Sequence, residues 1–214
     1  MKKNTSYGDQ ALNNMVSLYE DTEYKERKEV FLELIQLFKE NNVKWALGCS
    51  MNLFCRGLID DFHDLDIIVD KCSIETIKKI MNDLGAVLTE TGGNGFCESD
   101  IYFHYQLGRV DVDIISGFRV VTFGTSYYYP FKENEIDVIN TMQLTIPLIS
   151  LEAMYILYYM MEGWQPKRKF KRMLIEQYWE VETPKHLEIF KYALDEHDLP
   201  GQIKWSVKNI ISAL

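Results

Sequence analysis

The sequence lacks the features of disulfide-rich, zinc-binding and membrane-spanning proteins. Its four cysteines include no Cys-x-x-Cys pair. The spacing therefore predicts neither a zinc site nor a disulfide framework, and we expect reduced thiols, buried as small apolar side chains. No apolar run approaches the roughly 18 residues of a membrane span. These absences predict a soluble protein with no membrane partner.

Positive charge and an export signal are also lacking. Lysine and arginine number 23 against 32 acidic residues, which gives a net charge of −9 at pH 7. Such a chain repels a phosphate backbone outside a local basic patch, so long DNA is excluded, whereas a small acceptor, or an RNA or protein held at one patch, stays open. The basic start Met1-Lys2-Lys3-Asn4 runs into a polar stretch rather than an apolar signal-peptide core. We therefore expect a cytoplasmic location.

What is present suits a mixed fold. The chain has 214 residues, of which 47% are apolar, enough for one domain or for a core with a helical appendage. We predict an α/β (α+β) protein with a mixed sheet flanked by helices and followed by a C-terminal helical segment. The boundary is predicted near Thr145, with a core over 1–145 and a C-terminal helical segment over 146–214.

Periodicity gives the expected elements of the core. Helical spacing of apolar residues predicts a helix over 24–41, and the short apolar runs 43–47 and 65–69 predict buried strands. A helix capped by Ser73 is expected to end at Gly85. From 86 to about 146, β-branched and aromatic residues predict several antiparallel strands. Gly92-Gly93-Asn94-Gly95 lacks the strand-to-helix context of a dinucleotide loop and predicts a hairpin connection.

Four helices are predicted in the C-terminal segment. The first begins at Ser150, and the second begins in the basic run from Lys167. Thr183-Pro184 places a cap residue directly before a first-turn proline and so predicts the start of the third. Asp198-Leu199-Pro200-Gly201 separates the third from the fourth.

Asp64 and Asp66 are the first candidate site residues. Side chains alternate along a strand, so both carboxylates point to one side, about 6.7 Å apart along the chain. Both come before the apolar run Ile67-Ile68-Val69, which predicts that they lie at the start of a buried strand, where a metal ion can reach them. A bound Mg²⁺ would relieve their mutual repulsion. The alternative is a polar strand end, because residues 60–64 are largely acidic.

Two further motifs give this pair a context. Upstream, Gly48-Cys49-Ser50 forms a Gly-x-Ser turn before a short predicted helix, where backbone N–H groups can hold a phosphate. Downstream, Asp111 and Asp113 alternate on the predicted strand 109–115 and share one face. The order of turn, carboxylate pair and third carboxylate is the order that a two-metal site needs.

Over residues 43–117 this pattern resembles the nucleotidyltransferase superfamily, with its DNA polymerase beta-like minimal fold. Leu47-Gly48-Cys49-Ser50 is similar to the family's phosphate-binding turn, and Asp64-Leu65-Asp66 to its metal-binding strand. Asp113, directly before Ile114-Ile115, matches the third acid better than Asp111 does. The resemblance implies that Asp64, Asp66 and Asp113 are catalytic residues and ligands of Mg²⁺ or Mn²⁺. It implies nucleotide binding by Gly48, Cys49 and Ser50, and transfer of a nucleotide from a nucleoside triphosphate to an unidentified acceptor.

The C-terminal segment resembles bacterial antibiotic and abortive-infection nucleotidyltransferases less closely. Those relatives carry a lysine and an Arg-Pro-Lys-Asp-like segment where this chain has Tyr158 and Gln165-Pro166-Lys167-Arg168. A non-catalytic binding, antitoxin or regulatory module is therefore the alternative to an enzyme. The basic run 167–172 opposes its helix dipole unless an anion binds there, although a solvated face is the simpler interpretation.

Overall fold

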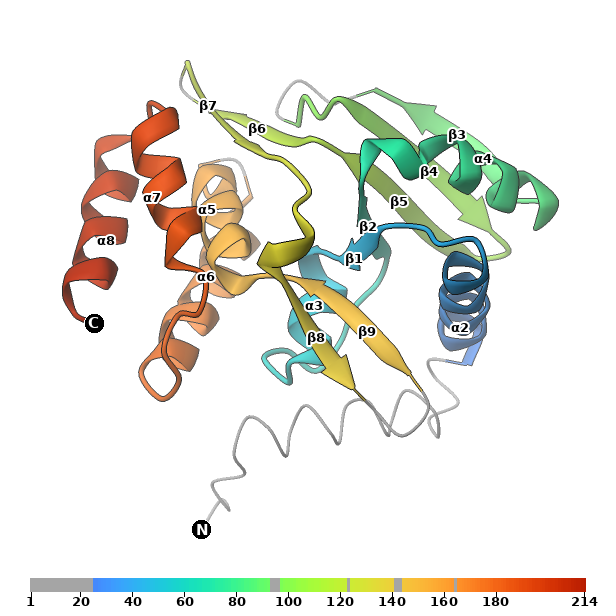
Figure 1. Ribbon diagram of the computed structural model, residues 1–214, viewed down its shortest axis with the longest axis horizontal. Coiled ribbons are helices and arrows are strands. Elements are labelled where there is room, and N and C mark those ends of the chain that lie inside the picture. The colour runs from blue at the N-terminus through green and yellow to red at the C-terminus, as the bar shows by residue number, and fades with distance from the viewer. Residues whose placement is uncertain (1–24, 93–96, 123, 141–143, 164) are drawn as a thin grey trace, which may run out of the picture.

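The fold centres on one mixed sheet of seven strands, in the order β3-β4-β5-β2-β1-β9-β8 (Figure 1). The structure, a computed structural model, describes residues 25–92, 97–122, 124–140, 144–163 and 165–214. The strands of this sheet are β1 (Trp45–Leu47), β2 (Leu65–Val69), β3 (Val87–Thr91), β4 (Ile101–Leu107), β5 (Val110–Ser116), β8 (Ile136–Asn140) and β9 (Thr145–Ile149). Strands β6 (Phe118–Thr122) and β7 (Thr125–Tyr129) form a separate hairpin. The predicted mixed class is confirmed.

Helices lie on both faces of the sheet (Figure 1). They are α2 (Lys25–Glu40), α3 (Cys49–Cys55), α4 (Ile74–Asp83), α5 (Leu151–Met161), α6 (Pro166–Trp179), α7 (Leu187–Glu196) and α8 (Gly201–Ser212), with short 3-10 turns at Lys71–Ser73 and Glu133–Glu135. The buried side chains form two apolar cores, one that includes α2 and α4 and one that includes α5, α7 and α8. The sheet therefore separates two packed layers.

Strand β2 shows how the sequence divides these layers. Leu65, Ile67 and Val69 belong to the core with α2 and α4, whereas Ile68 belongs to the core with α5. Side chains alternate along a strand, so Asp66 faces the α5 side together with Ile68. One face of β2 is thus wholly apolar, and the other carries the carboxylate.

The sheet extends further along the chain than predicted. Strand β9 runs parallel to β1, with Leu148 opposite Leu47, and antiparallel to β8. Residues 146–149, which the prediction counted with the helices, are therefore sheet residues, and the first C-terminal helix starts at Leu151. Residues 146–149 form a strand because they pair with β8 and with β1, which is distant in the sequence, and the local sequence gives no sign of this pairing. The division of the chain into two domains stays a prediction.

Two predicted caps are wrong. Helix α7 begins at Leu187 rather than at Thr183-Pro184, because the backbone N–H groups of Lys185 and His186 donate to the buried Glu152 carboxylate at 2.6 and 3.2 Å. The Ser73 hydroxyl precedes α4 but accepts from the Lys44 backbone N–H at 2.9 Å instead of capping its own helix. In both places a tertiary contact replaces the expected local one.

The structure bears on the predicted free thiols and on the hairpin predicted at 92–95. All four cysteines are free, and Cys49 and Cys55 are buried as expected, but Cys72 is exposed beside the Asp70 carboxylate that caps its turn. Most of the glycine-rich stretch at 92–95 lies outside the described residues; the strands on either side, β3 and β4, pair antiparallel.

None of the described helices combines the length and the apolar composition that a membrane span needs.

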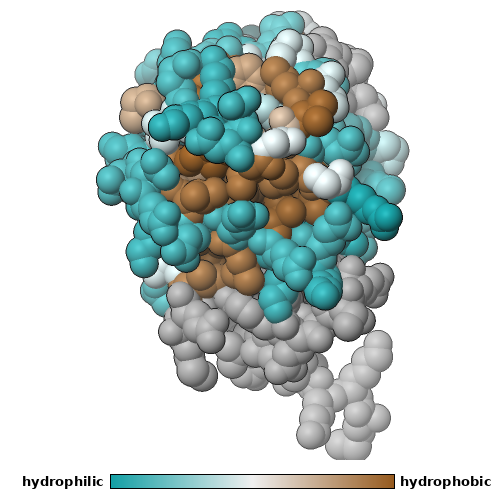
Figure 2. Space-filling model, turned by 90° about the vertical axis from the view of Figure 1, so that its right-hand side faces the viewer, coloured by the Kyte–Doolittle hydropathy of each residue, from teal (hydrophilic) through white to brown (hydrophobic). Residues whose placement is uncertain are grey.

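The side of the molecule with α2, α4 and β3 exposes a hydrophobic patch framed by hydrophilic residues (Figure 2). Strand β3 is an edge strand, and its Val87 and Leu88 side chains are 60% and 46% exposed. No acidic cluster that could hold a metal occurs among the described residues of this side, because the one such cluster faces the α5 layer.

Candidate functional site

Three predicted acids meet on the α5 side of the sheet. Strands β2 and β5 are parallel neighbours, and their register places Asp66 directly opposite Asp113. Asp64 precedes β2 and lies on the same face as Asp66, two residues on. Oxygen atoms of Asp64, Asp66 and Asp113 all lie within 4.8 Å of one another, the only group of metal-ligand type found in the described residues. Asp111 is not part of it.

Burial and mutual repulsion make this cluster unfavourable without a counter-charge. Burial, Asp64 and Asp113 together raise the pKa of Asp66 to about 7. Burial also raises the pKa of Asp113, against the opposing effect of a hydrogen bond from His104. Clustered carboxylate oxygens are the ligands that hard divalent cations prefer. The donor set therefore fits Mg²⁺ or Mn²⁺.

The predicted Gly-x-Ser turn lies against the acids. The Gly48 backbone N–H donates to the Asp66 carbonyl oxygen at 2.8 Å, and the Ser50 hydroxyl donates to Asp64 Oδ1 at 3.1 Å. A Cβ on residue 48 would lie 3.0 Å from Ile68 Cγ1, so only glycine packs here without displacement. Cys49 has a φ of 41°, a left-handed conformation that is uncommon outside glycine. The turn is thus built tightly around the end of β2.

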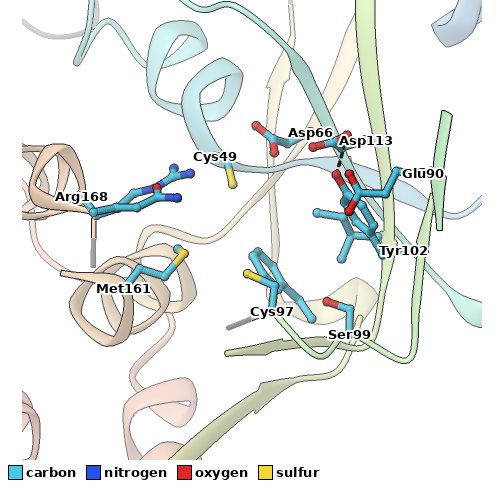
Figure 3. A pocket seen from close by; sticks show the side chains of 12 residues that line it. Cys49, Asp66, Glu90, Cys97, Ser99, Tyr102, Asp113, Met161 and Arg168 are labelled. Atoms are coloured by element: carbon cyan, nitrogen blue, oxygen red, sulfur yellow. Dashed lines mark hydrogen bonds between the residues drawn. The ribbon is translucent and has the colours of Figure 1, made fainter. Parts of the chain in front are cut away.

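Two cavities open on either side of Asp66. The lysine-side cavity, about 240 Å³, is lined by Ser50, Ile59, Asp61, Phe62, His63, Asp64, Asp66, Gln165, Lys167, Arg168 and Lys171. The tyrosine-side cavity, about 230 Å³, is lined by Cys49, Asp66, Glu90, Cys97, Ser99, Tyr102, Asp113, Ile115, Phe118, Met161, Gln165 and Arg168. Arg168 reaches toward Asp66 from helix α6, opposite Tyr102 and Glu90 (Figure 3). Asp66 lines both cavities, Asp64 only the first and Asp113 only the second.

Some cations of the basic run on α6 lie beside the acids, and others contact other parts of the fold. The Arg168 guanidinium and the Lys171 ammonium lie 5.6 and 5.8 Å from the centre of the Tyr158 ring. Tyr158 is fully buried and supports both cations beside the acids. Arg172 instead pairs with Glu162 and Glu176.

Lys169 lines a different cavity, between α5 and the start of α8. The cations of the run therefore do not all line one cavity. Burial and the neighbouring Arg168 lower the pKa of Lys171, as expected for two cations that share a half-buried place. Only the members of the run at 167, 168 and 171 face the acids.

Strand β4 contributes residues that the sequence analysis missed. His104 is paired with Asp113 across the antiparallel ladder, and its Nδ1 lies 2.5 Å from Asp113 Oδ1. The Tyr102 hydroxyl donates to the same oxygen at 3.2 Å. Burial lowers the pKa of His104, but the hydrogen bond and charge of Asp113 outweigh it, so the net shift is upward. The sequence did contain a signal for these residues: Tyr102, His104 and Gln106 alternate with apolar residues, which indicates that they share one face of a strand.

Comparisons with known proteins concern the fold. No protein-family model and no curated protein matches the sequence. The crystal structure of a Thermotoga maritima protein assigned as a nucleotidyltransferase superposes with a TM-score of 0.55 and 18% identity, over 71% of this chain and 94% of that one. ANT(2'')-Ia in complex with adenylyl-2''-tobramycin gives 0.51 and 13%, over 69% and 86%.

A solution structure of the antibiotic-resistance factor ANT(2'')-Ia is similar to the same extent, with a TM-score of 0.50 and 13% identity over 72% of this chain and 86% of that one. At these identities the likeness concerns the course of the chain rather than its chemistry. The sheet order, the acid-bearing strands and these superpositions agree that the chain has a nucleotidyltransferase fold.

Proposed function

We propose that the protein transfers a nucleoside monophosphate from a nucleoside triphosphate to a hydroxyl group of an acceptor and releases pyrophosphate. The observation that carries this proposal is the convergence of Asp64, Asp66 and Asp113 to within 4.8 Å between the lysine-side cavity, which three cations of α6 line, and the tyrosine-side cavity. A shared site of three carboxylates suits phosphoryl chemistry, in which positioning and charge stabilisation dominate.

Divalent cations, Mg²⁺ or Mn²⁺, would be held by these three carboxylates and would stabilise the attacking and leaving oxygens. The cations of the lysine-side cavity, Lys167, Arg168 and Lys171, bind the β- and γ-phosphates. The turn Gly48-Cys49-Ser50 supports the triphosphate from the other side, as the likeness to the family implies. Ser50 exchanges its hydrogen bond to Asp64 for one to a phosphate oxygen.

The two cavities suggest the direction of transfer. In an in-line displacement the attacking and leaving oxygens lie on opposite sides of the α-phosphorus. Pyrophosphate bound among Lys167, Arg168 and Lys171 therefore requires the acceptor hydroxyl to approach from the tyrosine-side cavity. Its oxygen bonds to the α-phosphorus, the bond from phosphorus to the bridging oxygen breaks, and Asp113, which lines this cavity, takes the proton.

A non-catalytic binding or regulatory module is the second candidate, favoured by Tyr158 in the place where relatives carry a lysine. The cations on α6 weigh against it. Arg168 and Lys171 lie over the Tyr158 ring, so positive charge reaches the acids from the next helix instead of from α5. Arg168 and Lys171 thus supply the positive charge that the lysine of the relatives would supply.

The test is an assay of pyrophosphate release and label transfer with each of the four α-labelled triphosphates, with Mg²⁺ or Mn²⁺. The acceptors tried are small hydroxyl compounds, short RNA and protein. Metal-dependent transfer that Asp66→Asn abolishes is the expected result. Triphosphate binding that persists in chelator, without transfer to any acceptor, would favour the binding module.

A further inference from the structure

We propose that His104 is a positioning residue: it orients the Asp113 carboxylate toward a divalent cation, and Asp111 influences the site only through His104. The inference rests on the metal-binding role proposed above for Asp113. Neither His104 nor Tyr102 ligates the cation. Both act on the third acid from strand β4.

The hydrogen bonds to Asp113 are arranged on one oxygen. His104 Nδ1 lies 2.5 Å from Asp113 Oδ1, and the Tyr102 hydroxyl donates to the same atom at 3.2 Å. A carboxylate only accepts, so His104 Nδ1 carries the proton and donates it. Two donors satisfy Oδ1 and leave Oδ2 as the oxygen for a cation. Hydrogen-bonded ligands of this kind are oriented by their partners.

The second ring nitrogen of His104, Nε2, faces Asp111, the other acid on this face of β5. His104 Nε2 lies 3.6 Å from Asp111 Oδ1, a charge contact too long for a hydrogen bond. Asp111 lies two residues before Asp113, about 6.6 Å along the strand, and is outside the carboxylate cluster. The imidazole therefore lies between two carboxylates, one that faces the site and one nearer the solvent.

Exposure fits this division of roles. The side chains of Asp113, His104 and Asp111 are 16%, 27% and 48% exposed, which is a graded series from the site to the surface. An Asp111 side chain half in water has little direct effect on a buried cluster, because its charge is screened. Its effect is instead to bias the orientation of the His104 ring.

The experiment measures Mn²⁺ binding to the full chain without nucleotide, by the electron-spin-resonance signal of free Mn²⁺. His104→Leu removes the donor to Asp113, and His104→Asn retains one, since the asparagine amide lies where Nδ1 does. Gln106→Leu is the matched control, because residue 106 lies on the same face of β4 but pairs with Asp111. Thermal unfolding in chelator reports the folding of each variant.

We expect His104→Leu to weaken Mn²⁺ binding by about 10- to 100-fold, as loss of such partners generally does. His104→Asn should stay within about threefold of wild type, and Gln106→Leu should not change. Asp111→Asn should have a small effect in wild type and none in His104→Leu, the coupling expected for residues that act in series.

Equal affinities in wild type and His104→Leu would overturn the proposal. So would an asparagine variant as weak as the leucine one, because the ring would then only fill space. If His104→Leu does not fold, Tyr102→Phe removes the second donor to the same oxygen, and an unchanged affinity there counts against the proposal equally. A wild-type chain that binds no Mn²⁺ would instead overturn the proposed metal site itself.

Discussion

The two faces of strands β2 and β5 differ in what they contribute. The face toward α2 and α4 carries Leu65, Ile67 and Ile114, all essentially inaccessible. The face toward α5 and α6 carries Asp66 and Asp113, whose pKa values are raised by burial. One face stabilises the fold, whereas the other holds two carboxylates that are electrostatically unfavourable without a counter-charge. The same two strands thus carry an apolar face and a face on which carboxylates lie beside the core residues Ile68 and Ile115.

The largest effect should come from the polar face of β5. Asp113→Asn is expected to lower turnover on the order of 10²-fold or more with little change in triphosphate binding, because the acid acts on the attacking hydroxyl. Asp111→Asn should be mild, since that side chain lies outside the cluster. Single-turnover kinetics of both variants measure this. A dead Asp111→Asn enzyme beside an active Asp113→Asn enzyme would show that the third acid is the other aspartate.

The apolar face of the same strand should respond in the opposite way. Ile114→Ala removes a fully buried side chain and should lower the free energy of unfolding by about 2–5 kcal/mol. Metal and triphosphate affinities of the folded variant should be unchanged. Urea unfolding in chelator, with Asp113→Asn as the neighbouring control, makes the measurement. If Asp113→Asn were the more destabilising of the two, the division between the faces would be wrong.

The basic run offers a smaller contrast within one helix. Arg168→Gln with Lys171→Gln should weaken Mg²⁺–triphosphate binding by about 10-fold or more at low salt, because charge-assisted hydrogen bonds to phosphate are lost. Lys169→Gln, the control in the same run, should change affinity by less than about twofold, since it lines another cavity. Calorimetric titration at two salt concentrations tests this. Equal losses in both variants would mean a diffuse charge effect.

The fourth expected effect is a pH dependence of the metal-free fold. Asp66 has a pKa of about 7 in the folded state and about 3.9 when unfolded. Between those values the folded state alone holds the proton, so the free energy of unfolding should fall as pH rises from 5 to 8.

The loss should be at most about 2–3 kcal/mol, since each pKa unit corresponds to about 1.4 kcal/mol. It should be smaller in Asp66→Asn, where only the raised pKa of Asp113 remains, and it should be reversed by Mg²⁺ at pH 8. The measurement is urea unfolding in chelator at several pH values, with and without the cation. Parallel pH curves for wild type and Asp66→Asn would contradict the raised pKa.

Local pattern predicted much of this arrangement. Alternation predicted the strand of Asp64 and Asp66 and the shared face of Asp111 and Asp113, and the glycine at 48 predicted the turn, because each depends on neighbours along the chain. The register that sets Asp66 opposite Asp113 depends on pairing across nearly fifty residues, and no local signal encodes it. The contribution of His104 follows from the same register. The cap expected at Thr183-Pro184 failed because a buried Glu152 accepts the backbone donors there.

We propose that Asp64 and Asp66 hold the cation through which the triphosphate binds. Calorimetric titration of each triphosphate into wild type and into the double variant Asp64→Asn, Asp66→Asn, with Mg²⁺ and with chelator, tests it most directly. We expect Mg²⁺-dependent binding in wild type and its loss in a double variant that unfolds at the same or a higher temperature. Equal affinity of the two proteins in the presence of Mg²⁺ would contradict it.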